Sequence, residues 1–265
     1  MSYYTIEKIY PFLYSVRDPL KVYCYLAVGE SRALLYDTGY GLGDIRAAVE
    51  TVTGLPLDVV LSHGHADHAS GAYQFEKAYL HEKDFAIYRE YMTEDFRRET
   101  LKGLAELPEG FDAEAYVRAG AGTIEPLKDG EIFDLGGLTA EVIEMPGHTA
   151  GSVGILLREA KIMLCGDAAS SHIWLFLDES LPLSTHIATL TRVSALDFET
   201  FFSAHSAREK PKAEIKKYVT VAKHASLEKA KPFKHGVPGL EAFIYRERGA
   251  EIVFNHKSFE GDASL

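Results

Sequence analysis

The segment Ser62-His63-Gly64-His65-Ala66-Asp67-His68 carries the strongest structural signal in this chain. Three histidines and one aspartate fall within six residues, directly after DVVLS at 58–62, a run that predicts a short buried strand. Imidazole nitrogens and carboxylate oxygens together suit zinc or another divalent transition metal. A packed core would use apolar residues instead, because buried imidazoles without partners are unfavourable. The segment therefore predicts a metal-binding loop that follows a strand.

Further candidate ligands lie elsewhere in the chain, each after a strand-like or apolar run. They are His148 after AEVIEMPG, Asp167 after KIMLCG, and His205 after FFSA. Neighbouring side chains of one tight loop cannot all converge on one point, so the histidine-rich loop needs ligands from other loops. Proteins built on sheets place their sites on loops of this kind. We therefore expect these three residues to complete the metal site.

These motifs, in this order, resemble the metallo-β-lactamase superfamily, particularly its glyoxalase II-like and lactonase-like hydrolases. The matching segments are HGHADH at 63–68, PGHT at 146–149, GDA at 166–168 and the final His205. Leu35-Tyr36-Asp37-Thr38-Gly39 also resembles the early aspartate motif of that superfamily. The resemblance implies an α/β (α+β) fold, a four-layer αββα sandwich, with a helical insertion at about residues 82–126.

The resemblance also implies a role for each candidate ligand. Carried over to this chain, the metal ligands are His63, His65 and His148 for the first ion, Asp67, His68 and His205 for the second, and Asp167 as a bridge between both. Asp37 would steady the histidine-rich loop from outside the ligand set. The implied cofactor is two divalent metal ions per chain, with Zn²⁺ expected and iron or manganese as alternatives.

Two departures from the usual pattern of the superfamily bear on this assignment. His205 lies in Ser-Ala-His-Ser rather than in the Gly-His-Gly that is common among relatives. Many acyl-homoserine-lactone lactonases of this fold have a tyrosine a few residues after the bridging aspartate, where this chain has Ser170, Ser171 and His172. A quorum-signal lactonase is therefore disfavoured, and His205 is the ligand that the resemblance supports least.

The implied activity is metal-dependent hydrolysis of a carboxylic ester, thioester or lactone. Two ions would share a water, lower its pKa toward roughly 7 and direct a bridging hydroxide at the substrate carbonyl. We expect Asp67 to orient that hydroxide and relay a proton, and His172 to donate a hydrogen bond to the developing oxyanion. Residues 85–96 and 172–177, both rich in aromatic side chains, are expected to wall a pocket for an apolar acyl or aryl body.

The same fold supports other functions, which are the alternatives to this one. A phosphodiesterase or nuclease is the first alternative, although the net charge of −11 and the lack of a large inserted nucleic-acid domain count against it. A mononuclear iron sulfur dioxygenase, which would use one group of ligands, is the second. Flavin-partnered di-iron proteins usually have glutamate where this chain has His65, so that class is disfavoured. A binding protein without activity has little reason to keep so complete a set of ligands.

The order of the predicted elements indicates a single domain over residues 1–265. Strands are expected in 6–16, 22–29 and 33–38, and a helix in 44–52. The aromatic residues at 85–96 recur every three to five positions, which is typical of a helix packed on a core. Further predicted elements are a hairpin in 131–145, a strand pair in 153–167, helices near 183–202 and 211–230, and a closing hairpin in 242–254.

Composition and the first residues favour a cytoplasmic protein, and the resemblance implies a small-molecule substrate. No apolar run is long enough to cross a membrane, and the first residues lack the features of a signal peptide. Neither nucleic acid nor a membrane is an expected partner, and a homodimer is left open. Cys24 and Cys165 are expected to be reduced core thiols. The lysine-rich segment from Arg208 to Lys234 predicts a solvated helical face, with contact to an anionic part of the substrate as the alternative.

Overall fold

Two β-sheets packed face to face dominate the computed structural model, which describes residues 3–104, 107–237 and 239–260. The first sheet has its seven strands in chain order, with antiparallel pairing from β1 to β4 and parallel pairing from β4 to β7. Its strands are β1 (Thr5–Tyr10), β2 (Leu13–Arg17), β3 (Tyr23–Val28), β4 (Ala33–Tyr36), β5 (Leu57–Val60), β6 (Ala78–His81) and β7 (Ile124–Leu127).

The second sheet has six strands in the order β14-β13-β11-β10-β9-β8. All of its neighbours are antiparallel except β11 and β13, which run parallel. Its strands are β8 (Ile132–Asp134), β9 (Thr139–Glu144), β10 (Val153–Leu157), β11 (Ile162–Leu164), β13 (Thr200–Ser203) and β14 (Ser206–Pro211). The predicted hairpin in 131–145 and strand pair in 153–167 are therefore confirmed.

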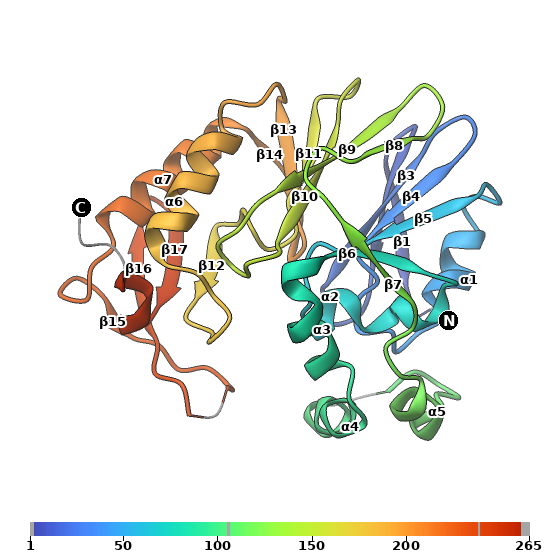
Figure 1. The fold of residues 1–265 in the computed structure, drawn as a ribbon, viewed down its shortest axis with the longest axis horizontal. Helices are drawn as coiled ribbons and strands as arrows, with labels where there is room; N and C mark the ends of the chain where they lie inside the picture. The colour runs from blue at the N-terminus through green and yellow to red at the C-terminus, as the bar shows by residue number, and fades with distance from the viewer. Residues whose placement is uncertain (1–2, 105–106, 238, 261–265) are drawn as a thin grey trace.

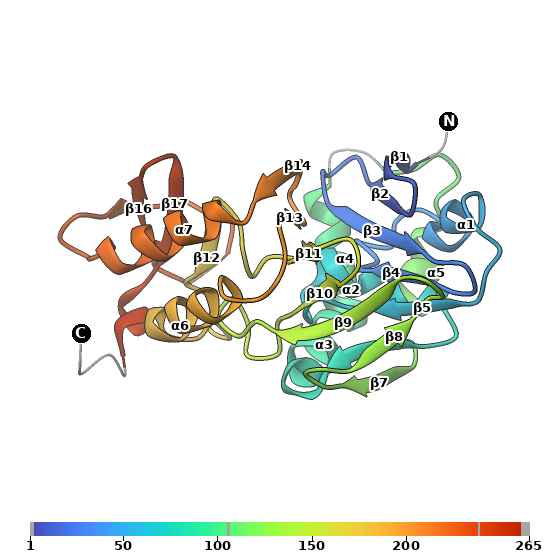
Figure 2. The same ribbon diagram turned by 90° about the horizontal axis from the view of Figure 1, so that it is seen from above.

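Both faces of the first sheet are covered, which explains why its central strands are apolar throughout. In β3 and β4, Tyr25 and Leu34 point toward the second sheet, whereas Leu26 and Leu35 point toward the helices on the other side. A strand that is buried on both faces reads as a continuous apolar run, because successive side chains alternate between the faces. The layers are helices, sheet, sheet and helices (Figure 2), so the expected four-layer sandwich is confirmed.

The helices against the first sheet include the predicted insertion. They are α1 (Ile45–Glu50), α2 (Ala66–Ala69), α3 (Phe85–Tyr91), α4 (Glu94–Gly103) and α5 (Ala113–Arg118), with short 3-10 helices at Ser70–Gln74 and Glu82–Asp84. The Asp44 side chain caps α1 by accepting from the Ala47 N–H at 2.8 Å. Helices α3, α4 and α5 belong to the helical insertion, which lies below the first sheet in Figure 1, and β7 occupies its predicted last residues.

The outer layer on the second sheet contains helices and a third, smaller sheet (Figure 1). That sheet has the order β12-β17-β16-β15, in which β12 and β17 are parallel. The elements of the layer are α6 (Leu183–Val193), α7 (Ala213–His224), β12 (His172–Leu175), β15 (Lys231–Pro232), β16 (Phe243–Glu247), β17 (Ala250–Phe254) and a 3-10 helix at His256–Phe259. One apolar cluster runs from the second sheet into this layer, and the single-domain organisation stays a prediction.

The predicted helix near 183–202 is wrong at its end. Helix α6 ends at Val193, and residues 200–203 form β13 between β11 and β14. Phe201 packs toward the outer helices and Phe202 toward the first sheet, so this short run is buried on both faces. Periodicity alone does not separate so short an apolar run from the last turn of a helix.

Cys24 and Cys165 are both buried and unpaired, as predicted. Among the helices of the described residues, none is long and apolar enough to cross a membrane.

Candidate metal centre

The candidate ligands come from strand ends of both large sheets. His63, His65, Asp67 and His68 follow β5, with His65 at the start of α2 and Asp67 in its first turn. His148 follows β9, Asp167 follows β11, and His205 lies between β13 and β14. Gly166 has a left-handed φ of 52°, and a Cβ there would lie 2.7 Å from Cβ of Ser62. This close approach brings the Asp167 loop against the histidine-rich loop.

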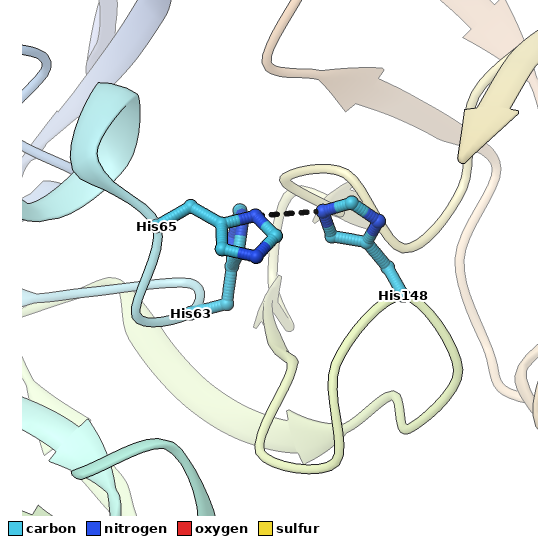
Figure 3. Close-up of side chains that lie close together, drawn as sticks. All are labelled: His63, His65 and His148. Atoms are coloured by element: carbon cyan, nitrogen blue, oxygen red, sulfur yellow. Dashed lines mark hydrogen bonds between the residues drawn. The ribbon is translucent and has the colours of Figure 1, made fainter. Parts of the chain in front are cut away.

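The first group consists of His63, His65 and His148, which are all buried. Nδ1 of His65 lies 3.0 Å from Nε2 of His63 and 3.0 Å from Nε2 of His148. Figure 3 shows the three rings converging from two separate loops. The rings stand close to perpendicular to one another, with interplanar angles of 78° to 89°. One nitrogen of each imidazole therefore points to a common centre.

The second group consists of Asp67, His68 and His205, with Asp167 between the two groups. Oδ2 of Asp67 lies 3.3 Å from Nε2 of His68 and 3.4 Å from Nε2 of His205. Oδ2 of Asp167 lies 3.2 Å from Nε2 of His205 and 3.8 Å from Nε2 of His148. The structure thus brings all seven predicted ligands together, and Asp167 lies where a bridging carboxylate is expected.

Four of the histidines use their outer ring nitrogen to contact the surrounding protein. His63 Nδ1 lies 2.9 Å from Ser62 Oγ, and His148 Nδ1 lies 2.7 Å from the carbonyl oxygen of Trp174. His65 Nε2 lies 2.7 Å from Glu179 Oε1, and His68 Nδ1 lies 3.0 Å from Asp37 Oδ2. Since each partner accepts, each outer nitrogen carries the proton and the inner nitrogen keeps its lone pair.

These contacts make a direct test of whether the cluster fits a cation. The inner nitrogen of His65 faces the inner nitrogens of both His63 and His148 at 3.0 Å, which is unfavourable for three lone pairs unless a proton or a cation lies between them. In the second group, Nε2 of His68 is buried and makes no hydrogen bond within the described part of the chain. Buried polar atoms normally have partners. Both groups therefore fit divalent metal ions.

The electrostatics differ between the two groups. Burial lowers the pKa values of His63 and His148, which favours the neutral imidazole that binds metals. Asp167 and Asp67 raise the pKa of His205 to about 10. Burial alone would lower the pKa of His68, but Asp67, Asp167 and Asp37 outweigh it and hold that pKa well above its ordinary value. The carboxylates of the second group therefore attract positive charge.

Asp37 contacts the histidine-rich loop as the resemblance implies. Its Oδ1 accepts from the Ser62 N–H at 2.7 Å, and its Oδ2 accepts from the Ser62 hydroxyl at 2.8 Å and from His68. Asp37 is fully buried and has a left-handed φ of 68°, an uncommon conformation for a residue other than glycine. This backbone conformation is compatible with a residue that orients ligands.

The prediction that His172 lies at the metal site is not supported by its position. His172 is exposed on β12, where its Nδ1 lies 2.5 Å from Glu251 Oε1 and its Nε2 accepts from the Trp174 indole at 2.6 Å. Both ring nitrogens are thus occupied outside the ligand cluster. Trp174 contacts His148 through its backbone carbonyl, and its indole N–H donates to His172. The segment 172–177 is accordingly a strand and its continuation, and its side chains do not supply the predicted oxyanion donor.

Two further residues lie at the first group: Glu179, which the sequence did not single out, and Tyr91, which belongs to the run 85–96 predicted to wall the pocket. Glu179, in the loop after β12, accepts from both His65 Nε2 and the Tyr91 hydroxyl, the latter at 2.9 Å. The Tyr91 ring lies 5.3 Å from the His65 ring. Phe85, Tyr88 and Phe96 pack in the core as predicted. Within the aromatic stripe of the insertion, Tyr91 is the residue that reaches a candidate ligand.

The lysine-rich segment lies on the outer layer. Lys216 and Lys223 are exposed on α7, whereas Lys210 is buried on β14 and donates to Ser203 Oγ. None of these lysines contacts a candidate ligand in the described part of the chain. The predicted solvated helical face therefore agrees with the structure.

Comparison with known proteins establishes the family. The model of the metallo-beta-lactamase superfamily matches residues 17–205, which is more than half of the chain. The chain belongs to the metallo-β-lactamase superfamily. Its match covers every candidate ligand from His63 to His205, and the early aspartate motif at Asp37 as well.

Among curated relatives, the chain is similar to two enzymes of the superfamily. It is 29% identical to the acyl-coenzyme A thioesterase MBLAC2 of Homo sapiens over 54% of this chain and 56% of the relative. It is 28% identical to the hydroxyacylglutathione hydrolase GloC of Haemophilus influenzae, over 52% of this chain and 61% of the relative. The alignments thus span little more than half the length of these relatives.

Solved structures show the same fold. A metallo-beta-lactamase family protein of Thermus thermophilus has a TM-score of 0.58 and 23% identity, with 80% of each chain covered. The protein TTHA1623, solved in a di-iron-bound form, also has a TM-score of 0.58 and 23% identity, and the match covers 74% of this chain and 92% of that protein. These similarities support the fold, while substrate choice depends on the loops around the site.

Proposed function

We propose that this chain is a dinuclear metal-dependent hydrolase that cleaves a carboxylic ester, thioester or lactone. The observation that carries the proposal is the convergence of two groups of ligand atoms, which Asp167 links through its proximity to His63 and His68, with inner ring nitrogens that face one another as they would around a metal ion. The similarity to an acyl-coenzyme A thioesterase and a hydroxyacylglutathione hydrolase favours an acyl substrate. Among acyl substrates, the similarity to an acyl-coenzyme A thioesterase favours a thioester.

The two groups would hold one ion each. His63, His65 and His148 supply three neutral imidazoles, and Asp67, His68 and His205 supply a harder set with one carboxylate. Asp167 would contact both ions. Zn²⁺ suits both sets, with iron or manganese as alternatives, and one structural relative is known in a di-iron-bound form. When bound, such ions provide a nucleophile from water at neutral pH and polarise an acyl oxygen.

The residues of the chain would position the reaction around these ions. Asp67 has one carboxylate oxygen toward His68 and His205, and its side chain is partly accessible at 23%. It is therefore placed to orient the attacking water and to pass its proton to the leaving group. Tyr91 and Glu179 lie against His65 and form one wall of the site. His172 has no part in this mechanism.

The test of the proposed function combines substrate and metal measurements. Purified protein is loaded with Zn²⁺, Mn²⁺ or Fe²⁺, and its turnover is measured on acyl thioesters, lactones, aryl esters and phosphodiesters. We expect thioester turnover to exceed phosphodiester turnover, and removal of metal by a chelator to abolish it. Preferred turnover of phosphodiesters would contradict the acyl specificity. A single iron with oxygen consumption would contradict hydrolysis altogether.

The position of His205 gives a further prediction. His205→Ala should lower the affinity for the second ion by more than about 100-fold and leave the affinity for the first almost unchanged. Loss of a residue that only contacts a ligand already costs about 10–100-fold in affinity, and loss of the ligand itself should cost more. Stepwise competition with a chromophoric chelator measures both affinities. His224→Ala, which removes an exposed histidine paired with Glu247 on the outer layer, is the matched control. Unchanged affinity in His205→Ala would remove His205 from the ligand set.

A further inference from the structure

Asp84 is a fully buried carboxylate that no function considered so far has used. It ends the 3-10 helix Glu82–Asp84 and lies directly before α3, at the start of the helical insertion. No lysine, arginine or histidine of the described residues forms an ion pair with it. A buried carboxylate without a cation needs hydrogen-bond donors, because removal from water is otherwise unfavourable. Where those donors lie indicates what Asp84 does.

All three donors to Asp84 come from the two loops that carry the first group of ligands. Oδ2 accepts from the Gly64 N–H at 3.0 Å and from the Thr149 hydroxyl at 2.7 Å. Oδ1 accepts from the Gly151 N–H at 2.6 Å. Gly64 separates His63 from His65, and Thr149 follows His148 directly. A single side chain thus fixes the backbone beside all three imidazoles, across two sheets.

The residues around Asp84 fix its carboxylate and the His148 loop relative to each other. A Cβ on Gly151 would lie 2.6 Å from Oδ1 of Asp84, so the loop approaches as closely as it does only because that residue is glycine. Ser152 Oγ accepts from the Thr149 N–H at 3.1 Å and lies 2.8 Å from Thr149 Oγ1. The Ser152 hydroxyl can therefore donate to Thr149, which leaves the Thr149 proton for Asp84. Every donor and acceptor in the network is matched.

We propose that Asp84 is a positioning residue that preorganises the first metal group by holding the His63–His65 loop and the His148 loop at a fixed separation. The inference rests on the proposed dinuclear centre. Charge-assisted hydrogen bonds are short and strong, so three of them on one carboxylate set the position of both loops. Within the described residues, Asp84 makes no hydrogen bond with Asp67, His68 or His205, and the outer contact of His68 comes from Asp37 instead. Loss of Asp84 should therefore lower the metal affinity of the first group and leave that of the second group unchanged.

The test isolates each group by removing a ligand of the other. A His205→Ala chain keeps the first group intact, and a His148→Ala chain keeps the second. Asp84→Asn is added to each, because one amide NH₂ then faces a backbone N–H and one loop loses its anchor. Zn²⁺ affinity is measured by chelator competition, and the absorption spectrum of bound Co²⁺ reports the geometry of each group.

In the His205→Ala chain we expect Asp84→Asn to lower the Zn²⁺ affinity by about 10–100-fold and to alter the absorption spectrum of bound Co²⁺. In the His148→Ala chain the affinity should not change. Thr149→Val, which removes only one donor, should weaken the first group in the same direction by less, and Thr149→Ser should restore it. The two Thr149 variants test the positioning role even if Asp84→Asn does not fold.

A carboxylate that pairs with an arginine instead of a ligand loop serves as the control. Asp58 on β5 forms a bidentate ion pair with Arg32, with Nε and Nη2 at 3.0 and 2.9 Å from its two oxygens. Asp58→Asn should lower stability without changing either affinity. Equal weakening of both groups by Asp84→Asn, or no weakening of the first, would overturn the positioning role. Failure of the unsubstituted chain to bind metal would instead overturn the proposed centre itself.

Discussion

Asp167→Asn is expected to reduce the metal content from two ions per chain to one or fewer, and to lower turnover by about 10³-fold. Asparagine keeps the size of the side chain but removes the charge that lies 3.2 Å from Nε2 of His205 and 3.8 Å from Nε2 of His148. Metal ions supply several kcal/mol of transition-state stabilisation. Each 1.36 kcal/mol is a tenfold change in rate, so losing about 4 kcal/mol gives the stated factor.

The measurement is elemental analysis of metal-saturated protein together with steady-state kinetics. Asp197→Asn is the matched control, since Asp197 is highly exposed and only pairs with Lys161 at 3.2 Å. That variant should keep both ions and full activity. If Asp167→Asn keeps two ions under metal excess, Asp167 is not a required bridge; if the unsubstituted protein never binds more than one ion, the dinuclear mechanism itself fails.

Arg97→Met is expected to lower the free energy of unfolding by about 3–4 kcal/mol. Arg97, on α4, is buried, and its guanidinium donates to the carbonyl oxygens of Ser70, Tyr116 and Gly120. It also lies between the rings of Tyr73 and Tyr116, at 5.0 and 4.6 Å from their centroids. Methionine would leave three carbonyl groups without their donor, and each lost hydrogen bond should lower the stability by about 1 kcal/mol or more.

Chemical denaturation of metal-free protein measures this effect without contributions from metal binding. The neighbouring Arg98 provides the control, because it is exposed and pairs with Glu114 on the surface. Arg98→Met should change stability by no more than about 0.5 kcal/mol. Similar losses in both variants would mean that the buried guanidinium contributes no more than a surface ion pair.

Since Ser70 directly follows the histidine-rich loop and α2, the contacts of Arg97 also anchor the insertion next to the candidate centre.

The sequence predicted the sandwich and the candidate ligands because both leave local signals. Ligands such as His148 and Asp167 directly follow buried strands, and strands that are covered on both faces read as apolar runs. The chain order of these motifs then resembled one superfamily over most of the chain. Proximity of the ligands in space follows from that fold and from no single segment.

The remaining features depend on contacts that the sequence does not show locally. His172 is five residues from Asp167, yet β12 pairs with β17 and turns its side chain toward Glu251. Glu179 and Asp84 are single acidic residues in polar stretches, and only the folded loops bring their oxygens to the candidate centre. The run Phe201-Phe202 resembled the end of a helix because two residues cannot display a period. Each of these errors concerns tertiary contacts rather than residue chemistry.

The division of the candidate ligands between the two large sheets has a consequence for the folded state as a whole. Four ligands follow β5 of one sheet, and the other three follow strands of the second sheet. An ion bound at this seam stabilises the native chain by thermodynamic linkage, by about 4 kcal/mol at 1,000 times its dissociation constant. Total stabilities of domains are only 5–15 kcal/mol. When metal is scarce in the cell, the folded fraction of the protein would then fall, in addition to the loss of its activity.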